Sequence, residues 1–177
     1  PIIGRDGTEP NDTYIEQLTA DAEAAVKAVV DLGVADPDRI AVGGHSYGAF
    51  MTANLLAHTD LFRTGIARSG AYNRTLTPFG FQSEQRTYWE APEVYDAMSP
   101  FAFADKVNEP ILLIHGADDS VVPIEQSKQM EKALKAAGKP VEFVTMAGED
   151  HWLSREPTRQ AMLKSAVAFV EKNNPPN

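Results

Sequence analysis

The sequence contains no cysteine, which excludes disulfide bonds, thiolate metal sites and a cysteine nucleophile. No apolar run approaches the ~20 residues that a membrane-spanning helix needs, and the first residues do not resemble a signal peptide. Basic residues are scarce, because 16 Lys and Arg stand against 25 Asp and Glu, which gives a net charge of −9. Nucleic acids and anionic membranes bind basic surfaces, so neither is expected as a partner.

The chain opens at Pro1, without an initiator Met. We therefore expect an internal segment of a longer polypeptide, and the compartment stays open. The 177 residues, of which 43% are hydrophobic, are enough for one domain with a core and few for two. No internal repeat or low-complexity linker divides residues 1–177, so we expect a single domain.

Short apolar segments alternate with segments of helical periodicity along the chain. The apolar segments predict strands at residues 39–43, 64–69, 111–115 and 141–146. Helices are predicted from 14 to about 32, from the turn after the first strand to 58, from 123 to 138, and from about 157 to the tail at 173. Such alternation is typical of a parallel sheet with helices on both faces and right-handed crossovers.

Two further features of this pattern lead to predictions. Thr13 and Glu16 have the spacing of a capping box at the start of the first helix. Residues 70–109, rich in Tyr, Phe and Pro, form an excursion between the second and third strands, and we expect short helices and no strand there. Because four strands make a small sheet for an α/β enzyme, further strands are expected upstream.

The turn after the first predicted strand carries a serine in the G-x-S-x-G frame, Gly44-His45-Ser46-Tyr47-Gly48. A serine at a strand-to-helix corner of this kind has a strained backbone, and the flanking glycines let strand and helix approach closely. The N–H of Tyr47 and the helix N-terminus then face the oxyanion that forms on attack. We predict that Ser46 is a nucleophile and Tyr47 an oxyanion donor. The alternative is a glycine-rich turn with a buried serine.

A serine nucleophile needs a base, and the chain has four histidines. His45 lies inside the turn, too close in sequence to act as the base. His58 ends a helix, where solvent or a capping role is expected, and His115 ends an apolar strand, where a satisfied core hydrogen bond is expected. Only His151 lies in the loop between the last strand and the last helix. We predict His151 as the base, with an ordinary surface histidine as the alternative.

The acid that orients the base is expected in the loop after the third strand, which holds Asp118 and Asp119. The chain order Ser, Asp, His is that of α/β-hydrolases and differs from the chymotrypsin and subtilisin orders. The chemistry of the two carboxylates does not choose between them. Glu149 and Asp150 precede the base, but neighbours in sequence rarely bend back onto a ring, so we expect both to be solvated.

With these three loops, the chain resembles the C-terminal part of the prolyl oligopeptidase family of serine peptidases. The resemblance covers nearly the whole chain and rests on Gly43-Gly44-His45-Ser46-Tyr47-Gly48-Ala49-Phe50-Met51, on Pro110-Ile111-Leu112-Leu113-Ile114-His115-Gly116 with Asp119-x-x-Val122-Pro123, and on Asp150-His151. In the family's His-Gly-x-x-Asp-x-x-Val-Pro motif the catalytic aspartate stands four residues before the proline, which selects Asp119. Residues 67–82 and 86–90 are most similar to the glutamyl endopeptidase-like branch.

The resemblance implies an α/β-hydrolase fold of which this chain forms the C-terminal part, with further strands and a β-propeller upstream. It implies hydrolysis of peptide bonds through an acyl-enzyme on Ser46, Asp119 and His151, without a cofactor. No metal is expected either, because the ligand spacing of a zinc site is missing. The family's second oxyanion donor also lies upstream, so we expect the 177-residue piece alone to be inactive or unstable. Val121 stands where some relatives have an arginine, so a substrate-binding role does not carry over to it.

The residues that contact substrate are less defined. Aromatic residues of the excursion are candidates for the pocket wall, with packing in the core or against a partner domain as the alternative: Tyr72, Phe79, Phe81, Tyr88 and Trp89. If the endopeptidase resemblance holds, Arg68, Arg74 or Arg86 pairs with an acidic side chain of the substrate. Each is otherwise a surface or structural arginine. The expected partner is a peptide, and a homo-oligomer remains open.

Two other functions stay open. An esterase of the dienelactone hydrolase type uses the same serine turn and the same order of residues on an ester. A degenerate hydrolase domain that only binds a partner is the second alternative, although all three catalytic residue types are present.

Overall fold

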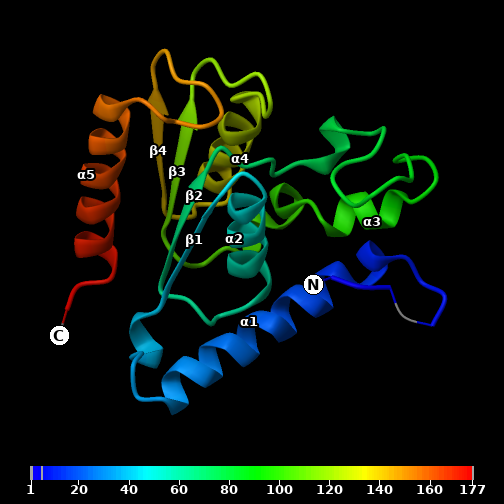
Figure 1. Ribbon diagram of the computed structural model, residues 1–177, viewed down its shortest axis with the longest axis horizontal. Coiled ribbons are helices and arrows are strands. Elements are labelled where there is room, and N and C mark those ends of the chain that lie inside the picture. The colour runs from blue at the N-terminus through cyan, green and yellow to red at the C-terminus, as the bar shows by residue number, and fades with distance from the viewer. Residues whose placement is uncertain (1, 5, 177) are drawn as a thin grey trace.

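The computed structural model describes residues 2–4 and 6–176. Four parallel strands form one sheet in the order β1-β2-β3-β4: Ala41–His45, Thr64–Arg68, Ile111–Gly116 and Val141–Met146. Helices α2 (Tyr47–His58) and α4 (Glu125–Ala136) cover one face, and α5 (Glu156–Asn173) covers the other (Figure 1). This is the α/β architecture that the alternating pattern predicts.

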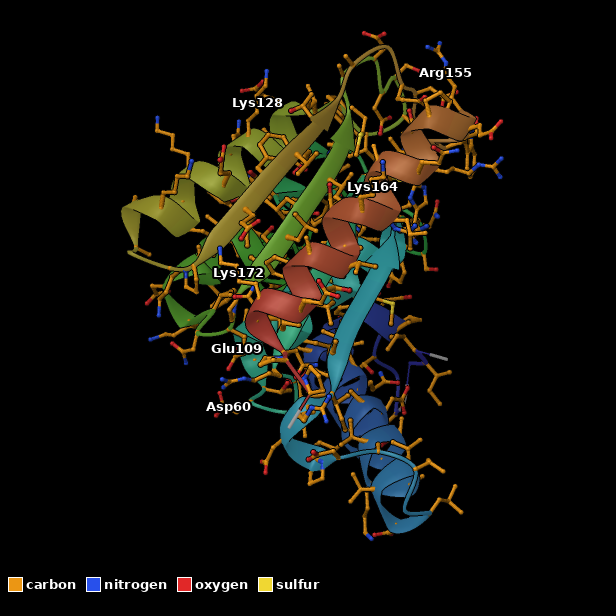
Figure 2. All side chains as sticks on the ribbon, turned by 90° about the vertical axis from the view of Figure 1, so that its left-hand side faces the viewer. Asp60, Glu109, Lys128, Arg155, Lys164 and Lys172 are labelled. Atoms are coloured by element: carbon orange, nitrogen blue, oxygen red, sulfur yellow. The ribbon has the colours of Figure 1, made fainter. Side chains whose placement is uncertain are left out.

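Strand β3 is one of the two inner strands of the sheet, and it is apolar on both faces because helices lie on each side of it. Residues 111–114 are completely buried. Leu113 packs toward α2 and α4, whereas Leu112 and Ile114 pack with Phe169 of α5. Figure 2 shows α5 lying across its face of the sheet, and Lys172 near its end pairs with Glu142 of β4 at 2.7 Å.

Helix α1 (Tyr14–Asp31) lies outside this layer and packs against α2. Its Tyr14 and Leu18 join a second core cluster with Phe50 of α2 and with α3 (Pro92–Ala97) from the excursion. The excursion otherwise contains two 3-10 helices, Arg74–Leu76 and Pro100–Lys106, and in the described part of the chain its only β contact is a single bridge between Phe81 and Glu84. The prediction of short helices without a strand is confirmed.

Two local predictions are wrong. The first strand starts at Ala41 rather than Arg39, because Asp36 accepts a hydrogen bond from the Asp38 N–H and caps a 3-10 turn over Pro37–Arg39. Thr13 forms no cap, because a 3-10 helix over Pro10–Thr13 runs directly into α1. Its hydroxyl accepts a hydrogen bond from Gln17 instead.

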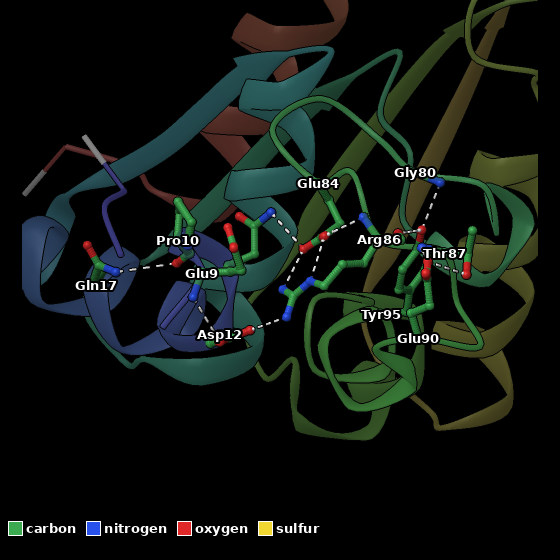
Figure 3. A network of polar contacts seen from close by, with 11 residues as sticks. Glu9, Pro10, Asp12, Gln17, Gly80, Glu84, Arg86, Thr87, Glu90 and Tyr95 are labelled. Atoms are coloured by element: carbon green, nitrogen blue, oxygen red, sulfur yellow. Dashed lines mark hydrogen bonds and ion pairs between the residues drawn. The ribbon is translucent and has the colours of Figure 1, made fainter. Parts of the chain in front are cut away.

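A polar network fastens the excursion to the N-terminal segment (Figure 3). The Glu84 carboxylate is buried and accepts bonds from Arg86 Nε and Nη2 and from Asn11. Arg86 also pairs with Asp12 at 2.8 Å. Hydrogen bonding from Arg86 lowers the pKa of Glu84 to about 2, so the carboxylate is ionised at neutral pH. None of the helices that the structure describes is long and apolar enough to span a bilayer.

Candidate active site

Three loops meet above the carboxyl ends of the strands, at the top of Figure 1. Ser46 follows β1, Asp119 follows β3 and His151 follows β4. His151 Nε2 lies 2.9 Å from Ser46 Oγ, and His151 Nδ1 lies 2.8 Å from Asp119 Oδ2. The structure therefore brings together the three residues that the sequence singles out, across separations of 105 and 32 residues.

The backbone at Ser46 is strained, with φ 56° and ψ −113°. Its N–H donates to the Arg68 carbonyl at the end of β2, and its carbonyl accepts from the first turn of α2. A Cβ atom on Gly44 would lie 2.4 Å from the Gly48 carbonyl carbon, so only glycine lets β1 and α2 pass this closely. Tyr47 is the first residue of α2, and its N–H has no partner within the helix.

The polarity of the three groups follows from their chemistry. An ionised carboxylate only accepts hydrogen bonds, so Asp119 requires a proton on His151 Nδ1. In the neutral ring, Nε2 is then an acceptor and takes the Ser46 O–H. The arrangement can remove the hydroxyl proton of Ser46 and stabilise the imidazolium that results.

Asp119 is held firmly by its surroundings. Its Oδ1 accepts the N–H groups of Val121 and Val122 at 2.9 and 2.8 Å, and its side chain is buried. Asp118 is exposed on the same turn. The geometry thus distinguishes between the two carboxylates in the same way as the family motif.

A second histidine, which the sequence reasoning placed only in the core, lies beside Asp119. His115 Nε2 is 2.8 Å from the Val122 carbonyl and 3.1 Å from Asp119 Oδ2. A carbonyl cannot donate, so Nε2 carries a proton and Nδ1 accepts from the Ser127 hydroxyl at 2.6 Å. Burial lowers the pKa of His115, which favours this neutral form. The signal in the sequence is its place four residues before Asp119.

The loop that carries His151 packs directly onto β3. A Cβ atom on Gly116 would lie 2.4 Å from the Glu149 carbonyl oxygen, so this glycine permits the contact. The expectation of a solvated Glu149 is wrong: the residue is 1% exposed and accepts a hydrogen bond from Thr158 at 2.5 Å. This bond ties the loop to α5. Asp150 is exposed, as expected, and caps the Trp152 N–H.

The two other histidines lie outside the chain of hydrogen bonds from Ser46 through His151 to Asp119. The His45 ring lies tilted beside that of His151, with 5.0 Å between the ring centroids, and burial lowers the pKa of His45. His58 is half-buried and packs edge-on against Phe103 rather than facing solvent. Its helix end lies under the 3-10 helix Pro100–Lys106, which shields the ring.

A cavity of about 150 Å³ opens beside the serine. It is lined by Ser46, Tyr47, Ala71, Arg74, Gln82, Val121 and Val122. The aromatic candidates lie elsewhere among the described residues. Tyr72 is wholly buried in the core beneath α4, so packing accounts for it. Phe81 is buried under the excursion in the cluster around α1.

The remaining aromatic candidates form a group on the excursion. Phe79 and Trp89 expose most of their side chains, and their ring centroids lie 5.6 Å apart. Tyr88 packs edge-on against Trp89. None of the three lines the cavity at Ser46. Their part in substrate binding stays a prediction.

The three candidate arginines occupy different environments. Arg86 is neutralised by Glu84 and Asp12. Arg68 lines a separate hollow of about 650 Å³ between β1, β2 and α5. Only Arg74 borders the cavity at Ser46. Within residues 2–4 and 6–176, no group of three or more His, Asp or Glu side chains is placed to hold a metal ion.

Several known proteins are similar in sequence to this chain. A model of the prolyl oligopeptidase family matches residues 12–174. The chain is 54% identical over its whole length to a probable chloroplastic glutamyl endopeptidase of Arabidopsis thaliana, of which it covers 19%. It is 34% identical, over 86% of its length, to an acylamino-acid-releasing enzyme of the same plant, of which it covers 22%. The chain thus spans about a fifth of these relatives.

Solved structures of peptidases have a similar fold. A puromycin-hydrolyzing peptidase of Mycobacterium tuberculosis superposes with a TM-score of 0.80 at 29% identity, covering 89% of this chain and 25% of that one. An acylaminoacyl peptidase of Pyrococcus horikoshii gives a TM-score of 0.80 at 27% identity, covering 93% and 29%. The sheet and its helices therefore have the arrangement found in α/β-hydrolase peptidases.

Proposed function

Because the chain belongs to the prolyl oligopeptidase family, we propose that it carries the catalytic triad of a serine peptidase. The observation that carries the proposal is the continuous chain of hydrogen bonds from Ser46 Oγ through His151 to Asp119, at 2.9 and 2.8 Å. A surface histidine or a merely buried serine has no need of this alignment.

The proposed reaction is acyl transfer to water. His151 takes the proton of Ser46 as its Oγ attacks the scissile carbonyl, and the Tyr47 N–H stabilises the oxyanion. His151 then protonates the leaving amine, so the C–N bond breaks and the acyl group remains on Ser46. Water, deprotonated by His151, then attacks the ester carbonyl, the bond from this carbon to Ser46 Oγ breaks, and His151 returns the proton to Oγ as the acid leaves. Asp119 keeps the ring in the tautomer that each step requires.

The substrate is proposed to be a peptide, and the glutamyl endopeptidase to which the chain is similar suggests cleavage after an acidic residue. The family's second oxyanion donor and its β-propeller are proposed for the longer protein, as the relatives are about five times longer than this chain.

The test uses the full-length protein, a fluorophosphonate probe and a library of peptides beside simple esters. Ser46→Ala is expected to abolish labelling and peptide cleavage. His151→Ala and Asp119→Asn are expected to slow acylation by about 10³-fold or more, because the base is lost or takes the wrong tautomer. Labelling of the Ser46→Ala protein at the wild-type rate overturns the proposal, and turnover of esters without peptides favours the esterase alternative.

A further inference from the structure

Arg74 is a buried cation without an anion. The residue is 6% exposed, and its Nε is buried with no hydrogen-bond partner. Throughout residues 2–4 and 6–176, no Asp or Glu lies within ion-pair distance of its guanidinium. An uncompensated buried charge costs several kcal/mol, so it is rarely retained for packing alone.

The protein stabilises this cation by aromatic faces instead of carboxylates. The guanidinium carbon lies 4.0 Å from the ring centroid of Phe50 and 4.5 Å from that of Phe81. Cation–π contacts of this kind hold the plane of the group but leave the hydrogen-bonding edge of the guanidinium unused. Burial lowers the pKa of Arg74 to about 10, which leaves it charged at neutral pH.

The location of Arg74 relates it to the proposed chemistry. It shares the cavity of about 150 Å³ with Ser46 and Tyr47, the nucleophile and the oxyanion donor. A cavity of this volume holds a molecule as large as benzene, and therefore one medium-sized side chain. A residue whose carbonyl is attacked by Ser46 has its own side chain within reach of this cavity. Among the residues that the structure describes, no other cation lines it, and position 121 is a valine.

We propose, resting on the proposed function, that Arg74 binds the side-chain carboxylate of the substrate residue that supplies the scissile carbonyl. The guanidinium presents a planar set of donors that matches a carboxylate, and the aromatic clamp holds it ready before substrate arrives. An acidic side chain supplies the missing anion. A neutral side chain of the same shape leaves the cation unpaired, so the pocket discriminates strongly between the two.

The experiment compares peptides that differ only in the residue before the scissile bond, Glu, Gln or Leu, on the full-length protein. Rates are divided by the active-site concentration found by fluorophosphonate labelling, so that misfolded protein does not count. The wild type is expected to favour Glu over Gln by about 100-fold in kcat/KM. Arg74→Gln is expected to bring this ratio close to one, by lowering kcat/KM for the Glu peptide far more than for the Gln or Leu peptide.

Two variants serve as matched controls. Arg74→Lys keeps the charge without the planar fork and is expected to give an intermediate ratio. Arg68→Gln removes an arginine that lines the other hollow and is expected to keep the wild-type ratio. Should the Arg74 variants fail to fold, product peptides ending in Glu or Gln are compared as inhibitors of wild-type labelling. The Glu peptide is expected to bind at least about tenfold more tightly.

The experiment distinguishes a failure of the role of Arg74 from a failure of the proposed function. A wild type that labels and cleaves peptides without preference for Glu overturns the role of Arg74 and leaves the proposed function standing. A preference that survives Arg74→Gln, is lost in Arg68→Gln, or is absent from product inhibition also overturns it. A wild type that neither labels nor cleaves any peptide overturns both proposals.

Discussion

His115 Nε2 lies 3.1 Å from Asp119 Oδ2, the same oxygen that contacts His151 Nδ1 at 2.8 Å. With the N–H groups of Val121 and Val122 on Oδ1, both oxygens of the carboxylate are engaged. Side chains held from several directions keep a fixed rotamer, which a catalytic acid requires. We infer that His115 is a positioning residue, acting on the nucleophile only through Asp119.

Replacing His115 tests this inference. His115→Leu removes the donor and is expected to lower kcat by about tenfold with KM nearly unchanged, because substrate does not touch the residue. His115→Gln retains an N–H donor at a similar distance and is expected to recover much of the loss. Steady-state kinetics of the full-length protein give both values. If both variants lost kcat equally, and in proportion to the fall in their melting temperatures, His115 would only fill the core.

The glycines on either side of Ser46 should differ in their tolerance of a methyl group. Gly44→Ala places Cβ 2.4 Å from the Gly48 backbone and is expected to cost at least about 2 kcal/mol and most of the labelling by a fluorophosphonate. Gly48→Ala meets no atom within 4 Å in this structure and removes a helical glycine, so its stability should stay the same or rise slightly. Thermal unfolding of the two variants checks the contrast. Equal destabilisation would contradict the close passage of β1 over α2.

The strands and the loops of the proposed active site follow from the sequence because their signals are local. The buried strand at residues 111–114 reads as a continuous apolar run, and the G-x-S-x-G turn carries its own geometry. The burial of Glu149 does not follow, because its partner Thr158 belongs to a helix whose position is set by the whole sheet.

The same distinction applies to the three arginines. In sequence they are equivalent, and the carboxylates that neutralise Arg86 include Asp12, from which it is separated along the chain by helices α1 and α2 and strands β1 and β2. Arg74 lies between Phe50 and Phe81, which come from different parts of the chain. Which arginine is neutralised by carboxylates and which is unpaired is therefore decided by tertiary packing alone.

Acid should loosen the attachment of the excursion. Glu84 has its pKa lowered to about 2 from an ordinary value near 4.5, chiefly by hydrogen bonding from Arg86. A lowered folded-state pKa contributes stability that is fully present above about pH 4.5 and is lost as the pH falls toward 2. That contribution is on the order of 2–3 kcal/mol for this buried side chain.

Glu84→Gln is the variant that checks this dependence. At pH 7 it should be less stable than the wild type, and the difference should shrink as the pH falls from about 4.5 toward 2, because the wild-type carboxylate is then protonated. Thermal unfolding across this range measures the difference. A gap that stays constant down to the lowest pH would show that Glu84 does not act through its charge.

The strained backbone at Ser46 should lower the stability of the fold. Its φ of 56° with ψ −113° is a conformation that glycine adopts freely and residues with a Cβ adopt at a cost of about 1–3 kcal/mol. Ser46→Ala keeps the Cβ and the strain, whereas Ser46→Gly relieves the strain. Glycine also increases the conformational entropy of the unfolded chain, which lowers the stability by about 0.5–1 kcal/mol. Both variants lose the proposed nucleophile, but the glycine variant should be more stable by roughly 1 kcal/mol and unfold at a higher temperature. Because activity is absent from both, any difference between them reports the backbone alone. A glycine variant no more stable than the alanine variant would mean that the positive φ at residue 46 costs the fold no stability.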